Sequence, residues 1–442
     1  MNRNRANKKR TGGASARVLS PVAAGMLAAA LCFQPMTALA GPAGDSSLTS
    51  SSSNAGPGGG SGSSNSGSTG SSGGSTSVSN GSVSAVTSGL GVYRVTENEG
   101  IGAIARGVDV SYWQQNVNWS QVASDNVQFA MLATRFRGNV DPFFTMNAAN
   151  ASQAGLRLGA YIYSYATSVE MAQQEADFVL NLIKDYPISF PVVFDAEDAN
   201  TLGTLTQSQV SDVINAFCKR IQDAGYYPMV YANEYWIANK IDMSKISYDI
   251  WVAKYQQKYT YSKTSMWQAS NTGSVKGVNG NVDIDYLYKD YTQIIPGNTW
   301  RTIAGNRYYY QNHVMQKAAW INDGQNWYYM NAAGNPSTGW LELSGKKYYL
   351  EADGHMITGW KTLDGGWRYF DASGEQATGW RAVDGSWYFM ADNGLMQTGW
   401  LETGGKKYYL NASGAMQAGW QNLGGSWYYF DGSGAMTTGW QA

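Results

Sequence analysis

Cysteine and histidine are scarce in this sequence, which has two of each among 442 residues. Cys32 lies in the first 40 residues, which resemble a removable leader, so Cys218 alone would remain and no internal disulfide is expected. His313 and His355 lie outside the α/β region described below. Their position excludes a Ser-His-Asp or Cys-His nucleophile and a histidine-ligated zinc site in that region. No glycine-rich phosphate loop follows a strand pattern.

Net charge and long apolar runs are also limited. The formal net charge is −1 at pH 7, and removal of residues 1–40, which carry six basic and no acidic side chains, would bring it to about −7. A chain of that charge does not attract nucleic acid. The apolar run from Val18 to Phe33 is too short for a permanent membrane span. We expect neither a nucleic-acid partner nor a permanent membrane span.

Composition divides the chain into four parts. Residues 1–40 have a basic start, an apolar run and the small-residue cleavage site Ala38-Leu39-Ala40, which predicts a secretory signal peptide. Residues 41–100 begin with an almost pure Ser, Gly, Asn and Thr stretch, which predicts a flexible linker. A catalytic barrel is expected at 101–292 and a repeat module at 296–442. The expected location is therefore extracellular.

Strand and helix patterns alternate from Gly107 to about Tyr288. Helical patterns occupy residues 119–124, 145–154, 169–184, 207–224 and 234–240. Apolar runs predict strands at residues 107–110, 128–134, 157–165, 191–197, 227–232, 249–254, 265–269 and 281–287. Five βα units followed by three bare strands favour an α/β fold, a modified (β/α) barrel with eight strands and about five helices. A doubly wound open sheet is the alternative.

Two carboxylates end the most apolar strand pattern, Phe190 to Asp198. Side chains alternate along a strand, so Asp195 and Glu197 should share one side at its carboxyl end. Paired acids with different proton affinities suit glycoside hydrolysis. If the barrel closes, Asp109 on the first strand and Asp283 on the last should join them at strand carboxyl ends. Asp285 lies on the same side as Asp283, and one of these two is expected to be a solvated or capping residue.

Aromatic residues near the strand ends form the expected rim of this acidic cleft: Tyr163, Tyr231, Trp251 and Trp267. Sugar rings stack on aromatic faces and acids bind hydroxyl groups, which favours a neutral or polyhydroxylated substrate. Because carboxylates are the only acid and base groups left, no cofactor and no metal are expected.

Seven motifs in this region occur in the order seen in glycoside hydrolase family 25, the muramidases or lysozymes of bacterial and phage type. They are Gly107–Gln114, Leu158–Tyr165, Phe194–Glu197, Tyr231–Asn233, Trp251–Ala253, Trp267–Gln268 and Val282–Asp285. The resemblance covers about residues 105–290. It implies a modified (β/α) barrel that cleaves the β-1,4 bond between N-acetylmuramic acid and N-acetylglucosamine in bacterial peptidoglycan.

The same resemblance implies roles for the acids. Glu197 would be the general acid, Asp195 would orient or stabilise the substrate's reacting acetamido group, and Asp109 and Asp283 would complete the pocket. Cα atoms of next-but-one strand residues lie about 6 to 7 Å apart, between the carboxyl spacings of retaining and inverting enzymes. The resemblance favours assistance by the substrate's own 2-acetamido group.

Tryptophan recurs every twenty residues from Trp300 to Trp440, which indicates a repeat array. Each unit reads as a short hairpin, and stacked neighbours predict an all-β hairpin-repeat solenoid. The units resemble choline-binding and related cell-wall-binding repeats, whose ligand sits in an aromatic box. Lys347, Lys407 and Arg307 stand where an aromatic is expected. The candidate walls are Trp340, Trp360, Trp380, Trp400 and Trp420 with Trp327, Trp367, Trp387 and Trp427.

These features predict a secreted peptidoglycan hydrolase held on the wall by its repeats, whose partner is choline-bearing teichoic acid or another wall glycan. A non-catalytic wall-binding or adhesive protein with a decayed barrel is the first alternative, and the retained acids argue against it. A chitinase-type hydrolase is the second, but Val192-Val193-Phe194 before Asp195 lacks the upstream acids of that family.

Overall fold

The computed structural model describes residues 84–88, 90–95, 100–255 and 257–439. The expected signal peptide, most of the expected linker and Trp440 lie outside these residues. Within the described part of the chain, no helix is both long enough and apolar enough to cross a membrane.

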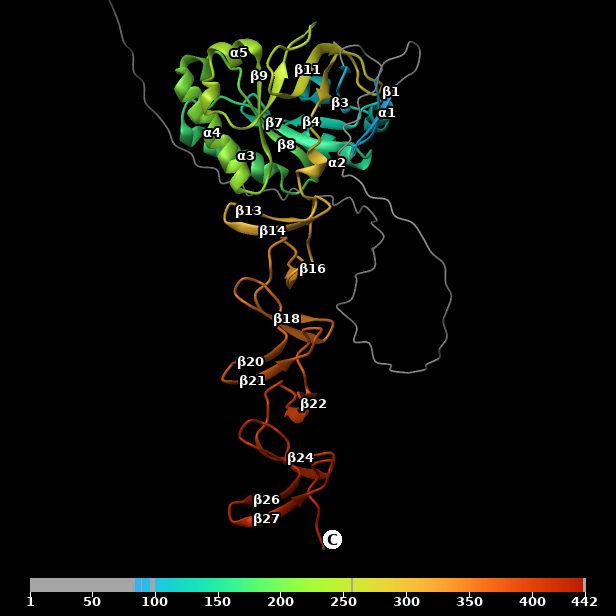
Figure 1. The fold of residues 1–442 in the computed structure, drawn as a ribbon, viewed down its shortest axis with the longest axis vertical. Helices are drawn as coiled ribbons and strands as arrows, with labels where there is room; N and C mark the ends of the chain where they lie inside the picture. Colours follow the sequence, from blue (N-terminus) through green and yellow to red (C-terminus); the bar gives the residue numbers. More distant parts are fainter. Residues whose placement is uncertain (1–83, 89, 96–99, 256, 440–442) are drawn as a thin grey trace, which may run out of the picture. The chain divides into compact units, whose positions relative to one another are not determined.

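Eight described strands close into a barrel (Figure 1). In barrel order the neighbours are β10, β11, β12, β3, β4, β7, β8 and β9, and β9 pairs with β10 to complete the ring. The closure confirms the predicted barrel and excludes the open sheet. The strands are β3 (Ala105–Val110), β4 (Phe129–Ala133), β7 (Arg157–Tyr163), β8 (Ile188–Asp195), β9 (Pro228–Asn233), β10 (Asp249–Ala253), β11 (Thr264–Gly273) and β12 (Val282–Leu287).

The last barrel strand, β12, runs antiparallel to both of its neighbours, β11 and β3. The expectation that Asp283 ends its strand is therefore wrong, because Asp283 is the second residue of β12. The reversal brings the start of β12 to the rim formed by the carboxyl ends of the parallel strands. Asp283 is consequently the register partner of Asp109 on β3.

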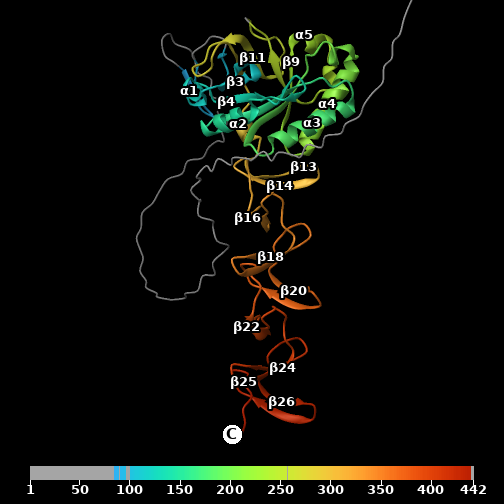
Figure 2. The same cartoon turned by 180° about the vertical axis from the view of Figure 1, so that it is seen from behind.

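Helices cover the outside of the barrel wall, as both views show (Figures 1 and 2). Ser168 caps α3, and Thr206 forms a capping box with Gln209 at the start of α4. The apolar faces of these helices pack on the outward-facing side chains of the strands, so β8 is buried along its whole length. The helices are α1 (Trp119–Ser124), α2 (Phe144–Gln153), α3 (Val169–Ile183), α4 (Gln207–Asp223) and α5 (Glu234–Asn239).

A short hairpin precedes the barrel, formed by β1 (Ser84–Ser88) and β2 (Gly91–Val95). The expected linker reached residue 100, so its predicted end is too late. Tyr93 is 1% exposed, and the Arg94 backbone exchanges two hydrogen bonds with the Asn126 side chain. Tyr93 supplies buried apolar area that the Ser- and Gly-rich stretch lacks.

The repeat region consists of antiparallel hairpins that follow one another along the chain (Figure 1). Two-residue turns such as Asp364-Gly365 have positive φ at both positions, as type I′ hairpins require. Each hairpin also joins the next unit through backbone bonds, for example Met356 N to Trp327 O at 2.7 Å. The paired strands are β13 (Thr299–Ile303) and β14 (Asn306–Gln311) with β15 (Val314–Met315), β16 (Ala319–Asn322) and β17 (Trp327–Met330), β18 (Gly339–Leu343) and β19 (Lys346–Leu350), β20 (Gly359–Leu363) and β21 (Gly366–Phe370), β22 (Gly379–Val383) and β23 (Ser386–Met390), β24 (Gly399–Thr403) and β25 (Lys406–Leu410), and β26 (Gly419–Leu423) and β27 (Ser426–Phe430).

The first hairpin differs from the others because it packs on barrel residues. Arg301 is 1% exposed, with its guanidinium 3.9 Å from the ring centroid of Tyr226 and 4.3 Å from that of Tyr310. The Tyr310 hydroxyl donates to the Lys184 carbonyl at 2.8 Å. This hairpin therefore joins the core of the barrel region in addition to starting the array.

Candidate active site

One cavity of about 420 Å³ lies at the rim where the parallel strands end, and it holds all four predicted acids. Asp109 comes from β3 and Asp283 from β12, whereas Asp195 ends β8 and Glu197 follows two residues later. Aromatic and basic side chains complete the lining. The residues are Asp109, Ser111, Trp113, Ala133, Arg135, Phe136, Arg137, Tyr161, Tyr163, Tyr165, Asp195, Glu197, Tyr231, Trp251, Tyr255, Gln268 and Asp283.

The central pair is Asp195 and Glu197. Asp195 is the last residue of β8 and is 5% exposed, whereas Glu197, two residues later, is only half-buried. Ala196 between them packs into the outer core. Strand alternation thus continues past the end of β8 and turns both carboxyl groups into the cavity. Glu197 is the more accessible of the two.

A hydrogen-bond network holds Asp109 in place. The Gln268 amide donates to Asp109 Oδ2 at 2.7 Å. The hydroxyls of Tyr231 and Tyr255 both donate to Gln268 Oε1, each at 2.8 Å. Gln268 therefore couples two cavity aromatics to a buried carboxyl group. Gln268 and Tyr255 were not predicted as site residues, although Gln268 directly follows the predicted Trp267.

Asp285 lies below this network inside the barrel. It is 0% exposed, and Trp251 Nε1 donates to its Oδ1 at 2.9 Å. The expectation that Asp283 or Asp285 is a solvated or capping residue is therefore wrong. Asp283 faces the cavity and Asp285 is buried beside Trp251, because residues two apart on β12 point inward at different depths.

Burial and mutual repulsion raise the proton affinity of the acids. Burial raises the pKa of Asp195 well above its usual value, and the charges of Glu197 and Asp198 add to this. Burial likewise raises the pKa of Asp109, followed by the charges of Asp283 and Asp285. Burial raises the pKa of Asp283 to about 6. Carboxyl groups in this cavity can therefore stay protonated near neutral pH.

Burial also raises the pKa of Glu197, and the charges of Asp283 and then Asp198 contribute. Asp198 itself remains an acceptor, because burial of its carboxyl is outweighed by hydrogen bonds from Thr201 and others that lower its pKa. Glu197 thus combines access to the cavity with a raised pKa, which is what a general acid requires.

The structure brings three of the four predicted aromatics to the cavity. Tyr163, Tyr231 and Trp251 line it, and the Tyr163 hydroxyl donates to Asp198 Oδ2 at 3.1 Å. Trp267 does not reach it: Trp267 is 1% exposed, donates to the Lys254 carbonyl at 2.9 Å and packs in the outer core. Its placement as a substrate contact is wrong because β11 points Gln268, not Trp267, inward.

Exposed aromatics extend the cavity rim. Trp113 in η2 (Tyr112–Gln114) is 68% exposed. Its ring centroid lies 5.7 Å from that of Phe136, in an edge-on contact. Phe136 belongs to the small hairpin formed by β5 (Arg135–Phe136) and β6 (Asn139–Val140) and stacks on Tyr112 at 4.1 Å. Trp113 lies in the first motif, so that motif was the available signal for this rim.

Arg135 is a partly buried cation beside the acids. Its Nη2 lies 2.6 Å from Glu175 Oε1, and Ser164 Oγ donates to the other Glu175 oxygen at 2.6 Å. The guanidinium also lies 4.7 Å from the Tyr165 ring centroid. Glu175 neutralises Arg135, so this pair fixes the cavity wall and leaves the acidic character of the site intact. Among the described residues, no group of three or more His, Cys, Asp and Glu side chains is arranged to hold a metal ion.

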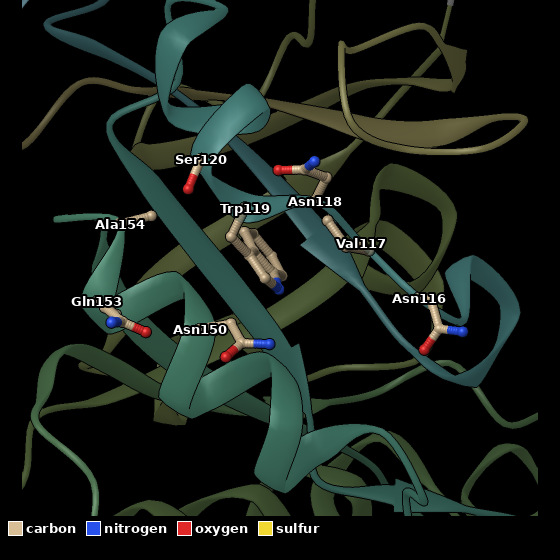
Figure 3. Close-up of a pocket in the computed structure, with 8 residues that line it drawn as sticks. All are labelled: Asn116, Val117, Asn118, Trp119, Ser120, Asn150, Gln153 and Ala154. Atoms are coloured by element: carbon tan, nitrogen blue, oxygen red, sulfur yellow. The ribbon is translucent and has the colours of Figure 1, made fainter. Parts of the chain in front are cut away.

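A larger hollow, of about 610 Å³, lies outside the barrel near α1 and α2 (Figure 3). Asn116, Asn118, Ser120, Asn150 and Gln153 supply its polar groups, and no carboxylate lines it. The Trp119 ring at its centre is 2% exposed and donates to Asn147 at 3.1 Å, so it belongs to the core. This hollow lacks an acid and base, and the acidic cavity is the better candidate for catalysis.

The repeats build a second kind of site. The Gly-Trp tryptophans from Trp340 to Trp400 each contact an aromatic nine residues later and one in the following hairpin, as Trp360 does with Tyr369 at 5.1 Å and Tyr388 at 4.8 Å. Trp367 adds a third wall at 6.4 Å. Trp380 has the same neighbours in Phe389 and Tyr408. The predicted walls Trp340, Trp367, Trp387, Trp400, Trp420 and Trp427 are 41–65% exposed, so their faces are accessible.

Family models match both regions. A model described as glycosyl hydrolases family 25 matches residues 108–278. A choline-binding repeat model matches residues 337–378 and 377–418, and a putative cell wall binding repeat model matches 319–335 and 418–436.

Curated relatives match about two fifths of the chain. The uncharacterized protein YegX of Escherichia coli K12 is 31% identical over 189 residues, which cover 40% of this chain and 68% of YegX. Lysozyme M1 of Streptomyces globisporus is 30% identical over 195 residues, 40% of this chain and 66% of that protein. Autolytic lysozyme of Clostridium acetobutylicum is 25% identical over 185 residues, 41% of this chain and 55% of that protein.

Solved structures include choline binding protein F from Streptococcus pneumoniae, at 33% identity and a TM-score of 0.30 over 39% of this chain. The match spans 63% of that chain, which is less than two thirds of its length. The modular Cpl-1 endolysin complexed with a peptidoglycan analogue matches at 22% identity and a TM-score of 0.35, over 71% of this chain and 94% of that one.

Proposed function

Since the chain belongs to glycosyl hydrolase family 25, we propose that it is an N-acetylmuramidase that cleaves the β-1,4 bond between N-acetylmuramic acid and N-acetylglucosamine in bacterial peptidoglycan. Its repeats hold it on the wall through choline-bearing polymers or another wall glycan. Residues 1–40 direct its secretion.

One observation carries this proposal: carboxyl groups from β3, β8 and β12 converge on a single cavity rimmed by aromatic rings. Among the acids of that cavity, Glu197 and Asp283 are both partly accessible and raised in pKa, and the resemblance to family 25 assigns the proton donor to Glu197. A substrate rich in hydroxyl groups suits this lining, because carboxylates accept hydrogen bonds from hydroxyls and sugar faces stack on Trp113 and Phe136.

Glu197 acts as the general acid and donates its proton to the glycosidic oxygen as the bond to that oxygen breaks. The 2-acetamido oxygen of the substrate attacks the anomeric carbon, and Asp195 orients that acetamido group. Water then reopens the intermediate and loses a proton to Glu197, which restores the acid. Asp109, held by Gln268, and Asp283 shape the pocket around the reacting sugar.

Product analysis tests the bond that is cut. Peptidoglycan digested by the full chain should release new reducing ends on N-acetylmuramic acid, measured by borohydride reduction and mass spectrometry of the fragments. Reducing ends on N-acetylglucosamine would identify a glucosaminidase instead. Absence of new reducing ends, with wall binding retained, would support a non-catalytic wall-binding protein.

Choline recognition is proposed for the complete aromatic boxes. Trp360, Trp367 and Tyr388 surround one position with three rings from two hairpins. A quaternary ammonium cannot donate a conventional hydrogen bond, so aromatic faces are the environment that binds it best. Several such boxes on one array multiply the effective concentration of the enzyme at the wall surface.

A further inference from the structure

One repeat unit departs from the aromatic box at three positions at once. In the units that begin at Trp320, Trp360 and Trp380, the residue seven positions later is Trp and the residue 28 positions later is Tyr. In the Trp340 unit these positions are Lys347 and Arg368. A third position, 36 residues after the first tryptophan of the unit, is Met in those three units and Gln376 here.

Arg368 occupies the place of the missing ring. Its guanidinium carbon lies 5.1 Å from the Trp340 ring centroid, where the other units place a Tyr at 4.8–5.0 Å. The Arg368 side chain is 8% exposed, and its Nη2 lies 3.4 Å from Asp364 Oδ2. Its Nη1 donates to the Asn393 carbonyl, while its buried Nε has no hydrogen-bond partner.

The three replacements share one cavity of about 440 Å³, lined by Trp340, Leu341, Glu342, Lys347, Asp364, Arg368, Gln376 and Asn393. Trp340 is 41% exposed and is the only aromatic in this lining. Among the described residues, the Lys347 ammonium forms no ion pair, although Lys347 is the register partner of Glu342. The cavity thus offers cationic hydrogen-bond donors and anionic hydrogen-bond acceptors beside one exposed aromatic ring.

We infer that the Trp340 unit is closed to quaternary ammonium ligands and instead binds a saccharide of the wall. This inference rests on the proposed function of the repeats. Arg368 already provides the cation that the Trp340 ring attracts, and a second cation would meet the positive charges of Arg368 and Lys347. Hydroxyl groups can accept from Lys347 and Arg368 and donate to Glu342 and Asp364, with a sugar face against Trp340.

Choline titration of the full chain by isothermal calorimetry tests whether the Trp340 unit is closed to quaternary ammonium ligands. The double variant K347W/R368Y restores both walls, and we expect it to bind one more choline per chain than the parent. The control R368K keeps the cation and should leave the number unchanged. The unaltered boxes report correct folding in each variant. An unchanged number in K347W/R368Y would overturn the inference, whereas a parent that binds no choline would overturn the proposed function of the repeats.

The saccharide is tested in an E197Q background, which keeps the catalytic cavity intact without turnover. The probe is the disaccharide of N-acetylglucosamine and N-acetylmuramic acid. Two equivalents are expected, one in the catalytic cavity and one at Trp340, and W340A should reduce the number to one. Equal numbers of bound disaccharides with and without the W340A substitution would overturn the assignment of a sugar to this unit.

Discussion

The barrel and the repeats build their sites over very different distances in the sequence. In the barrel, Asp109 receives its hydrogen bond from Gln268, which is 159 residues away, and pairs in register with Asp283. In the repeats, Trp360 finds its walls 7, 9 and 28 residues later. The barrel site therefore exists only when the ring closes, whereas each repeat site needs only one neighbouring unit.

The functional side chains of the two regions also differ in burial. The barrel keeps Asp109 and Asp195 at 5% exposure, where burial raises the pKa of each. The repeats leave Trp387 and Trp400 nearly half exposed. Charge chemistry benefits from a dry, low-dielectric environment, and capture of a ligand on a polymer requires open faces. The two regions should consequently respond independently to substitutions.

The largest expected effect separates catalysis from attachment. E197Q should lower the rate of peptidoglycan hydrolysis by about 10²-fold or more because the proton donor is lost, while sedimentation with walls stays unchanged. W360A should show the reverse, with weaker sedimentation and normal hydrolysis of a soluble glycan. Turbidity and reducing-end assays measure hydrolysis. Parallel losses of both properties in either variant would contradict the independence of the two regions.

Gln268 should matter for catalysis although it carries no charge. Q268A leaves Asp109, Tyr231 and Tyr255 without their shared partner. An unsatisfied buried group costs about 1–3 kcal/mol, so we expect kcat to fall by roughly 5- to 150-fold with little change in wall binding. N271A, on the same strand but exposed, is the matched control. A kcat equal to that of the control would show that Asp109 needs no support from Gln268.

Much of the architecture follows from local patterns in the sequence. The five helices begin within one residue of their predicted starts, because a 3.6-residue period and capping residues such as Ser168 are local signals. The direction of β12 could not be predicted, since a period of two is the same in both chain directions. The convergence of Asp283 with Asp109 was correctly expected, but the reason is the reversal of that strand.

Side-chain choices within a strand were less predictable. Trp267 was predicted as a site residue in place of Gln268 because aromatics suit sugars. The side of β11 that faces the cavity depends on its pairing with β10, which has a register shift between Ile250 and Trp251. Such a shift cannot be predicted from the sequence of a single strand. The depth of Asp285 is likewise a property of the closed ring. In the repeats, the period reveals each hairpin, but the contact of Arg368 with Trp340 crosses between units.

The pH dependence offers a finer distinction within the barrel. Burial and then the charge of Asp283 raise the pKa of Glu197. D283N removes that charge, so the pKa of Glu197 falls and the proton donor is lost at a lower pH. The alkaline limb of the kcat/KM profile should therefore shift toward acid, whatever the loss in maximal rate. D290N, which removes a carboxylate outside the cavity lining, serves as the control. An alkaline limb that stays in place would exclude Glu197 as the group that controls it.

The smallest expected effect concerns stability and again separates the two regions. Burial raises the pKa of Asp283 in the folded state from 3.8 to about 6. An acid with a raised folded pKa favours folding when protonated, so its ionisation progressively destabilises the barrel as pH rises from about 4 to 6. D283N should therefore raise the Tm of the barrel transition at pH 7 and have no effect at pH 3. In calorimetry only the barrel transition should move, because the repeat hairpins do not contribute to the cavity that holds Asp283. A barrel transition that is unchanged at pH 7 would show that the acids of the cavity do not weaken the fold that holds them.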